Sequence, residues 1–428
     1  MSLEKVQLNN GLSIYHDRIA GEQTNSVKML LPYGSVDEKP AEEGVAHVFE
    51  HCVHLKTDQF TSREDLRSYA ARNGMITNAN TSYTRTVYYA DGLDLEPNMH
   101  HLSQILQHTH LPEDKVEHEL KAIRREAMTR LDNTGVAHMD AVDNAIFGKP
   151  YGRDIIGYHD KLDFSADTLR QLHQRYYKLG RMSLIVSGKA KLDEVIALAT
   201  RYFDADNTPY DTSHDSALPI NLGRKYTTGL VRDEMQNVKL QLSYPMTPEL
   251  RAHYLRNEIS FTVAQSALSD ACFNALRYDK GVADNGNISF STYNHPNAWR
   301  LGAYATVGKQ DINTTQTTFN EIFKRNGSDY SDDDITAALA ESAYVLNSNL
   351  MTTDKRTNAH IRKLASYREP EDLAIDRRKL ARLTVSDIRS AIDTLSEHVQ
   401  STASYTHLTG NRKDIGDVER IIERSDFA

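Results

Sequence analysis

Two histidines and a glutamate near the start of the chain have a spacing that could bind a metal. Residues 44–51 read Gly-Val-Ala-His-Val-Phe-Glu-His, in a stretch of helical character, with His47 and His51 four residues apart. Side chains four residues apart project from the same face of a helix, so both imidazoles can reach one zinc ion at about 2.0–2.1 Å. Glu50 is offset around the helix and can take a proton from a water on the metal. The spacing, an inversion of the H-E-x-x-H motif, predicts a zinc site that activates water.

A zinc site that performs chemistry needs a third protein ligand, usually a carboxylate, and keeps one position open. The long helix expected over 114–131 carries three candidates, Glu117, Glu119 and Glu126. Glu119 and Glu126 are two helical turns apart and share a face, so one could bind the metal while the other holds a histidine's second ring nitrogen. Spacing does not decide between them. The alternative is that the histidines and glutamates of both helices bind no metal and are ordinary residues on helix faces exposed to solvent.

Two stretches about half the chain apart follow the same plan. Residues 88–131 and 304–346 each contain a strand that ends in glycine, an amphipathic helix, an aspartate-rich break and a long helix. The two glycines, Gly92 and Gly308, are 216 residues apart, and a second matched pair downstream is offset by 219. A period this long predicts a duplicated domain rather than a solenoid.

Strands cluster early in the first copy and helices cluster in its middle, which predicts α+β layers rather than a doubly wound parallel sheet. Strands are expected at 3–8, 11–17, 25–33, 75–81, 84–91 and 182–188, and helices at 42–56, 63–73, 114–131 and 165–177. Residues 204–219 are polar and rich in turn formers, as in a linker. The predicted organisation is a first domain at 1–207, a linker at 208–221 and a homologous second domain at 222–428.

Composition excludes several classes of protein. The chain has 428 residues, of which 39% are hydrophobic, enough for more than one core. A net charge of -9 offers no attraction to phosphate, so neither nucleic acid nor an anionic membrane is an expected partner. No apolar run approaches the roughly 18 residues of a membrane span, and the N-terminus lacks a signal-peptide pattern. Cys52 and Cys272 make no disulfide framework, so we expect a cytoplasmic location.

Further blocks surround the histidine motif in a fixed order. Residues 34–38 read Gly-Ser-Val-Asp-Glu, residues 74–81 read Gly-Met-Ile-Thr-Asn-Ala-Asn-Thr, and residues 119–126 read Glu-Leu-Lys-Ala-Ile-Arg-Arg-Glu. Together with the motif at 47–51, they resemble the inverzincin zinc metallopeptidases, the family of insulinase, pitrilysin and the mitochondrial processing peptidases. The resemblance covers nearly the whole chain and is strongest in the first half.

The resemblance implies one Zn²⁺ per subunit, bound by His47, His51 and Glu126. It implies that Glu50 is the catalytic base, and that Glu119 is the family's second carboxylate, which acts beside the ligands. It also implies two homologous α/β-layer domains in tandem, forming half of a clamshell.

Two such subunits usually close around a chamber that admits unstructured peptides, so the implied partners are a peptide and a second similar subunit. A heterodimer is slightly favoured over a homodimer. The substrate would add to the edge strand 74–81 through main-chain hydrogen bonds. Asn78, Ala79 and Thr81 are therefore expected substrate contacts.

The second half departs from the family pattern at one position. Active relatives supply an arginine and, seven residues later, a tyrosine that hold the substrate and the developing oxyanion. Arg277 matches the arginine, but Asp284 occupies the tyrosine position, where a negative charge would repel an oxyanion. Tyr278, Tyr293 or a partner subunit could supply the missing group.

The sequence is therefore compatible with two functions. The first is a zinc-dependent endopeptidase or oligopeptidase that hydrolyses unstructured peptides in a closed chamber through a zinc-activated water. The alternative is a non-catalytic or only conditionally active subunit of a heterodimeric peptidase complex. The intact ligand set and Glu50 favour the first, and Asp284 favours the second.

Overall fold

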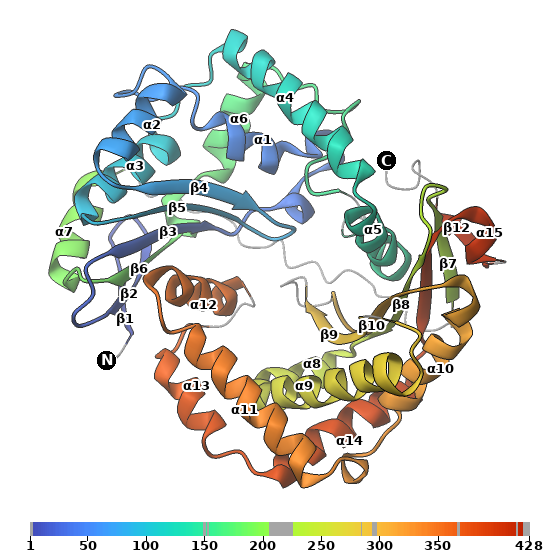
Figure 1. Ribbon diagram of the computed structural model, residues 1–428. Helices are drawn as coiled ribbons and strands as arrows, with labels where there is room; N and C mark the ends of the chain where they lie inside the picture. Colours follow the sequence, from blue (N-terminus) through green and yellow to red (C-terminus); the bar gives the residue numbers. More distant parts are fainter. Residues whose placement is uncertain are drawn as a thin grey trace. The chain divides into compact units, whose positions relative to one another are not determined.

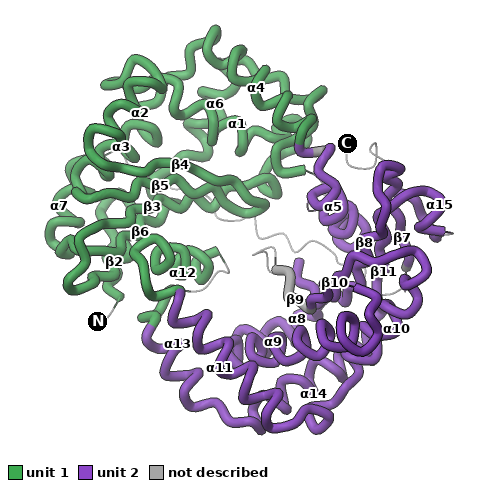
Figure 2. Tube along the Cα trace, in the orientation of Figure 1, with its two compact units in different colours: residues 1–129, 154–216, 349–373 green, residues 130–153, 217–348, 374–428 purple. Residues whose placement is uncertain are grey.

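The computed structural model describes residues 3–148, 151, 154–204, 226–283, 285–292, 298–365, 369–416 and 418–422. The chain forms two compact units, coloured separately in Figure 2. Unit 1 comprises residues 1–129, 154–216 and 349–373, and unit 2 comprises residues 130–153, 217–348 and 374–428. No helix among the described residues is both long enough and apolar enough to cross a membrane.

Unit 1 is built on a six-stranded sheet in the order β1-β2-β6-β3-β5-β4. Its strands are β1 (Glu4–Gln7), β2 (Ser13–Arg18), β3 (Asn25–Leu31), β4 (Ile76–Thr81), β5 (Thr86–Gly92) and β6 (Ser183–Gly188). All neighbours are antiparallel except β2 and β6, which run parallel. This order leaves β4 at one edge of the sheet.

Helices cover both faces of this sheet, and Figure 1 shows α1 and α3 on one side with α12 on the other. The helices of unit 1 are α1 (Val45–Cys52), α2 (Arg63–Arg72), α3 (Leu95–Gln107), α6 (Ala166–Tyr176), α7 (Leu192–Tyr202) and α12 (Thr353–Ala365), together with most of α4 (Glu113–Asp132). Alternate strand residues face opposite ways. In β3, Val27 and Met29 therefore join the main core with α1 and α3, whereas Leu30 packs with Ile361 of α12.

Unit 2 repeats the plan with the order β12-β7-β11-β8-β10-β9. Its strands are β7 (Tyr226–Val231), β8 (Val238–Pro245), β9 (Asn287–Thr292), β10 (Trp299–Val307), β11 (Tyr405–Gly410) and β12 (Arg420–Ile422). The run β7-β11-β8-β10-β9 has the same order and directions as β2-β6-β3-β5-β4. The sixth strands differ, because β1 is antiparallel to β2 whereas β12 is parallel to β7. The predicted α+β fold with an internal duplication is confirmed.

The remaining helices lie in the second half of the chain, apart from α5. They are α5 (Thr134–Phe147), α8 (Pro248–Arg256), α9 (Glu258–Asn274), α10 (Ile312–Phe323), α11 (Asp332–Ser348), α13 (Leu373–Leu380), α14 (Val385–Ser401) and α15 (Arg412–Ile415). α11, α14 and α10 pack against α9, and α10 also contacts β8 and β10.

The units are not the two consecutive stretches expected from the sequence. α5 belongs to unit 2, where it contacts β7, β8 and β11, and α12 belongs to unit 1, where it contacts β3 and β6. The helix that follows the long helix of each repeat thus covers the sheet of the other repeat. The predicted linker at 208–221 lies outside the described residues.

An ion pair holds each of these two helices, part-buried in unit 1, where the side chains are 14% and 4% exposed, and buried in unit 2. In unit 1, Arg356 of α12 donates to Asp17 of β2 at 2.6 and 2.7 Å. In unit 2, Arg300 of β10 donates to Asp143 of α5 at 3.2 Å, and both side chains are 1% exposed. The acid lies on the sheet in one unit and on the helix in the other. Since buried charges need partners, the charged residue on each helix is paired with one of opposite charge on the sheet that the helix covers.

Candidate metal centre

The turn before α1 fixes where the helix begins. Gly44 has a φ of 88°, and a Cβ there would lie 2.4 Å from the carbonyl oxygen of Ile156, so a side chain does not fit. Glu38 accepts hydrogen bonds from the backbone N–H groups of Gly44 and Ala46 at 2.9 and 2.8 Å. These contacts satisfy N–H groups that have no partner within the helix. α1 therefore begins at Val45, three residues later than predicted.

The pattern of α1 decides which side chains it presents to the site. Four of its fully buried apolar residues, Val45, Val48, Phe49 and Cys52, are spaced i, i+3, i+4 and i+7, and Ala46 beside them is also fully buried. This stripe anchors the helix in the core of unit 1. The remaining faces carry His47, Glu50 and His51.

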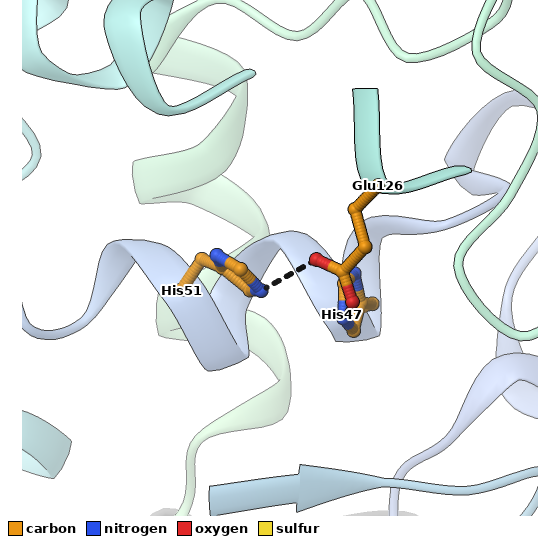
Figure 3. A group of neighbouring side chains, drawn as sticks. All are labelled: His47, His51 and Glu126. Carbon is orange, nitrogen blue, oxygen red and sulfur yellow. Dashed lines mark ion pairs between the residues drawn. The ribbon is translucent and has the colours of Figure 1, made fainter. Parts of the chain in front are cut away.

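His47, His51 and Glu126 form a group that could hold a metal ion. One donor atom from each lies within 4.8 Å of the others. Figure 3 shows the carboxylate of Glu126, from α4, directed toward the two imidazoles of α1. His47 Nε2 lies 3.7 Å from Glu126 Oε1, and His51 Nε2 lies 3.4 Å from Glu126 Oε2.

This donor set fits a zinc ion. Tetrahedral ligands about 2.0–2.1 Å from zinc lie about 3.3–3.4 Å from one another. The two nitrogen-to-oxygen distances in the group, 3.7 and 3.4 Å, are close to that separation. Two imidazoles and one carboxylate are also a common protein ligand set of catalytic zinc. The structure brings the three predicted ligands together, and zinc binding itself stays a prediction.

Glu119 is not one of the three residues of the group, but it contacts one of them, His51. His51 Nδ1 is 2.8 Å from Glu119 Oε1, and because a carboxylate only accepts, the ring donates there. The other ring nitrogen, Nε2, then faces Glu126. Burial alone would raise the pKa of Glu119, but its hydrogen bond with His51 and the charge of Arg63 outweigh this, so the pKa is lowered. Glu117 lies elsewhere, exposed and paired with Lys121 at 2.9 Å. The distances thus distinguish Glu117, Glu119 and Glu126 as candidate metal ligands, which their spacing in the sequence did not.

Glu50 is held by the edge strand of the sheet. Thr81, the last residue of β4, donates its hydroxyl to Glu50 Oε2 at 2.6 Å. Burial raises the pKa of Glu50, although the hydrogen bond from Thr81 partly opposes this. A carboxylate in such a setting binds a proton more readily than one in water, as a general base requires.

The strand beside Glu50 has an open edge. Among the described strands, β5 is the only partner of β4, with Asn78 opposite Tyr89 and Ala79 opposite Tyr88. The residues of β4 alternate between exposed and more buried positions, with Asn78 exposed and Ala79 buried. An extended chain could add to this edge through backbone hydrogen bonds. The predicted contacts Asn78, Ala79 and Thr81 thus lie on one strand that reaches Glu50.

The predicted substrate residue of the second half lies in unit 2. Arg277 is exposed on a short π-helical segment, Ala275–Asp279, at the end of α9. It lines a cavity of about 400 Å³ together with Tyr278, Gly281, Val282 and Ala283. Asp284 and Tyr293 lie outside the described residues, so the predicted departure at the tyrosine position stays a prediction.

Sequence reasoning missed Arg63, which lies beside the predicted ligands. Its guanidinium donates to the carbonyl oxygen of His51 at 2.7 Å and lies 3.2 Å from Glu119. One signal was present in the sequence. Arg63 is the first residue of α2, directly after its N-cap Ser62, where the helix dipole disfavours a cation. A cation at such a position suggests a tertiary partner.

Two family models match successive parts of the chain. The model described as Insulinase (Peptidase family M16) matches residues 16–157, and the model described as Peptidase M16 inactive domain matches residues 163–341. The chain belongs to peptidase family M16. The resemblance to the inverzincin metallopeptidases is thereby confirmed.

Individual M16 relatives agree with this assignment. An uncharacterized zinc protease of Rickettsia bellii is 21% identical over 359 residues, which cover 82% of this chain and 83% of the relative. A probable mitochondrial-processing peptidase subunit beta of Schizosaccharomyces pombe is 30% identical over 206 residues, 47% of this chain and 44% of the relative. A protease from Helicobacter pylori of known crystal structure has a TM-score of 0.77 at 18% identity, covering 95% of this chain and 99% of that one.

Several M16 relatives are named zinc proteases, which supports a peptidase that uses zinc. The likeness to the Helicobacter pylori structure, at 18% identity, shows the fold alone.

Proposed function

We propose that this M16 chain is a zinc-dependent endopeptidase or oligopeptidase that hydrolyses unstructured peptides. The observation that carries the proposal is the convergence of His47 and His51 from α1 with Glu126 from α4, beside Glu50. These three ligands would hold one zinc ion, which when bound supplies a Lewis acid that activates water and polarises a carbonyl.

The chain's own residues would divide the remaining work. Glu50 would accept the proton of the attacking water and pass it to the leaving amine. Thr81 would keep the Glu50 carboxylate in place through its 2.6 Å hydrogen bond. Glu119 would fix the tautomer of His51, so that Nε2 is the nitrogen available to the metal.

The proposed substrate is an extended peptide because of the edge that would receive it. Strand addition to β4 uses main-chain hydrogen bonds, which a folded substrate has already committed to its own structure. Asn78 and Ala79 would contact the added strand, and a substrate contact by Arg277 stays a prediction. Closure around a chamber by a second similar subunit and a cytoplasmic location stay predictions.

A second candidate is a subunit that is active only with a partner. The Schizosaccharomyces pombe relative is named as a subunit, and the family model that matches residues 163–341 is described as an inactive domain. In this version the zinc site would be as above, and groups for the oxyanion would come from a different chain.

The test is zinc content together with cleavage of a quenched, unstructured peptide, for wild type and Glu50→Gln. Glu117→Gln, at an exposed glutamate of α4, is the matched control. We expect about one zinc in all three proteins, turnover in wild type and the control, and a loss of at least about a hundredfold in Glu50→Gln. Zinc without turnover, rescued by a co-expressed homologue, would favour the second candidate. Absence of bound zinc would exclude both candidates.

A further inference from the structure

Arg63 joins two parts of the metal centre that the chain places far apart. Its Nη2 donates to the carbonyl oxygen of His51 at 2.7 Å. Its Nη1 donates to Glu119 Oε1 at 3.3 Å, and Nη2 lies 3.2 Å from the same oxygen. Because His51 Nδ1 donates to that oxygen as well, the contacts close a ring through Arg63, Glu119 and both ends of His51.

A metal ligand must keep a fixed orientation. Each contact of this ring restricts the movement of His51 or of the carboxylate that orients it. The carbonyl of His51 is among the last of α1, and such carbonyls have no partner within their own helix. Its contact with Arg63 fixes the last turn of α1. Glu119 has a side chain only 9% exposed, and a buried carboxylate needs a charged or hydrogen-bonded partner. Arg63 meets this need through the same oxygen, Oε1, that accepts from His51.

We propose that Arg63 is a positioning residue of the metal centre, which holds Glu119 against His51 and thereby aims His51 Nε2 at the metal. The inference rests on the proposed function, since it concerns the same zinc site. A planar guanidinium suits the role because its several N–H groups reach two acceptors at fixed angles, which an ammonium does not.

The test is the zinc dissociation constant of the full chain, measured by competition with a chromophoric chelator. Residues that orient a metal ligand typically contribute 10- to 100-fold to affinity, so we expect a loss of about that size in Arg63→Gln. Arg67→Gln is the matched control, because Arg67 is exposed one turn later on α2. It should bind within about twofold of wild type. Arg63→Lys should fall between wild type and Arg63→Gln.

A double-mutant cycle with Glu119→Gln separates positioning from a merely structural cap on α1. If Arg63 acts through Glu119, Arg63→Gln should cost less than about threefold once Glu119 has been replaced. The same loss in both backgrounds would overturn the proposal, as would an unchanged affinity of Arg63→Gln. If Arg63→Gln does not fold, the same cycle is run with Arg63→Lys. A wild-type chain that binds no zinc would instead overturn the proposed function.

Discussion

His138 and His407 lie in the interior of unit 2, and we predict that they make its stability sensitive to acid. Their side chains belong to residues only 1% and 2% exposed, and their ring centroids are 5.1 Å apart. His138 Nδ1 lies 2.8 Å from the hydroxyl of Thr409, and His407 Nδ1 lies 2.6 Å from that of Thr228. Burial lowers the pKa of His407 to about 3 and that of His138 well below its ordinary value.

The sign and size of the effect follow from proton binding. An exposed imidazole in the unfolded chain has a pKa of about 6.5. Below that pH the two histidines are protonated in the unfolded chain. In the folded chain they stay neutral until the pH approaches their lowered pKa, so the free energy of unfolding falls as the pH falls. Between pH 7.5 and pH 5.5, each histidine should lower the free energy of unfolding by about 1.4 kcal/mol, and the pair by about 2.7 kcal/mol.

The only tryptophan of the chain makes the assay specific to unit 2. Trp299 is 3% exposed on β10 and packs against Tyr254 at 5.2 Å between ring centroids. Its fluorescence during urea unfolding therefore reports this unit at both pH values. In His407→Gln, the difference in stability between pH 7.5 and pH 5.5 should shrink by about 1.4 kcal/mol.

His253→Gln is the control, because His253 is exposed on α8 of the same unit. It should leave the difference unchanged. A His407→Gln protein with the full wild-type difference would refute the reasoning, since His407 would then not resist protonation in the folded state.

Three further outcomes are expected. Arg300→Leu leaves Asp143 buried without its partner and should lower the free energy of unfolding of unit 2, followed by Trp299 fluorescence, by about 3–5 kcal/mol. Adding Asp143→Leu should recover most of this loss, and equal losses in the single and double variants would contradict the prediction. Thr81→Val removes the hydrogen bond to Glu50 and should lower kcat/KM for a quenched peptide about tenfold with zinc content unchanged, whereas unaltered kcat/KM would argue against that contact. Gly157→Ala places a methyl group 2.8 Å from the Cα of Gly44, so calorimetry should show unit 1 destabilised by about 1–3 kcal/mol. An unchanged melting temperature would count against the close packing at this position.

The sequence was most informative where periodicity and geometry coincide. Residues four apart on a helix share a face in any fold, so His47 and His51 could be paired without knowing what surrounds them. The duplication was readable because both repeats keep the strand and helix pattern, which the two sheets then reproduce. The helix around the motif is shorter than its pattern suggested, because Gly44 needs a backbone conformation and a close approach that only tertiary structure reveals.

Other features depend on contacts between distant residues and left little trace in the sequence. Glu119 and Glu126 share a helix face, and what separates their roles is the reach of each side chain across to α1. The exchange of α5 and α12 is accompanied by ion pairs between residues more than a hundred positions apart, Asp143 with Arg300 and Asp17 with Arg356. Arg63 belongs to the same class, since its two acceptors lie on α1 and α4.

A zinc ion between α1 and α4 would scatter anomalously, so diffraction recorded at the zinc absorption edge would locate it. Crystals grown with zinc should show one anomalous peak about 2.0–2.2 Å from His47 Nε2, His51 Nε2 and a Glu126 oxygen. A map without a peak there, with Glu126 turned away from the two imidazoles, would show that these residues do not form a zinc site.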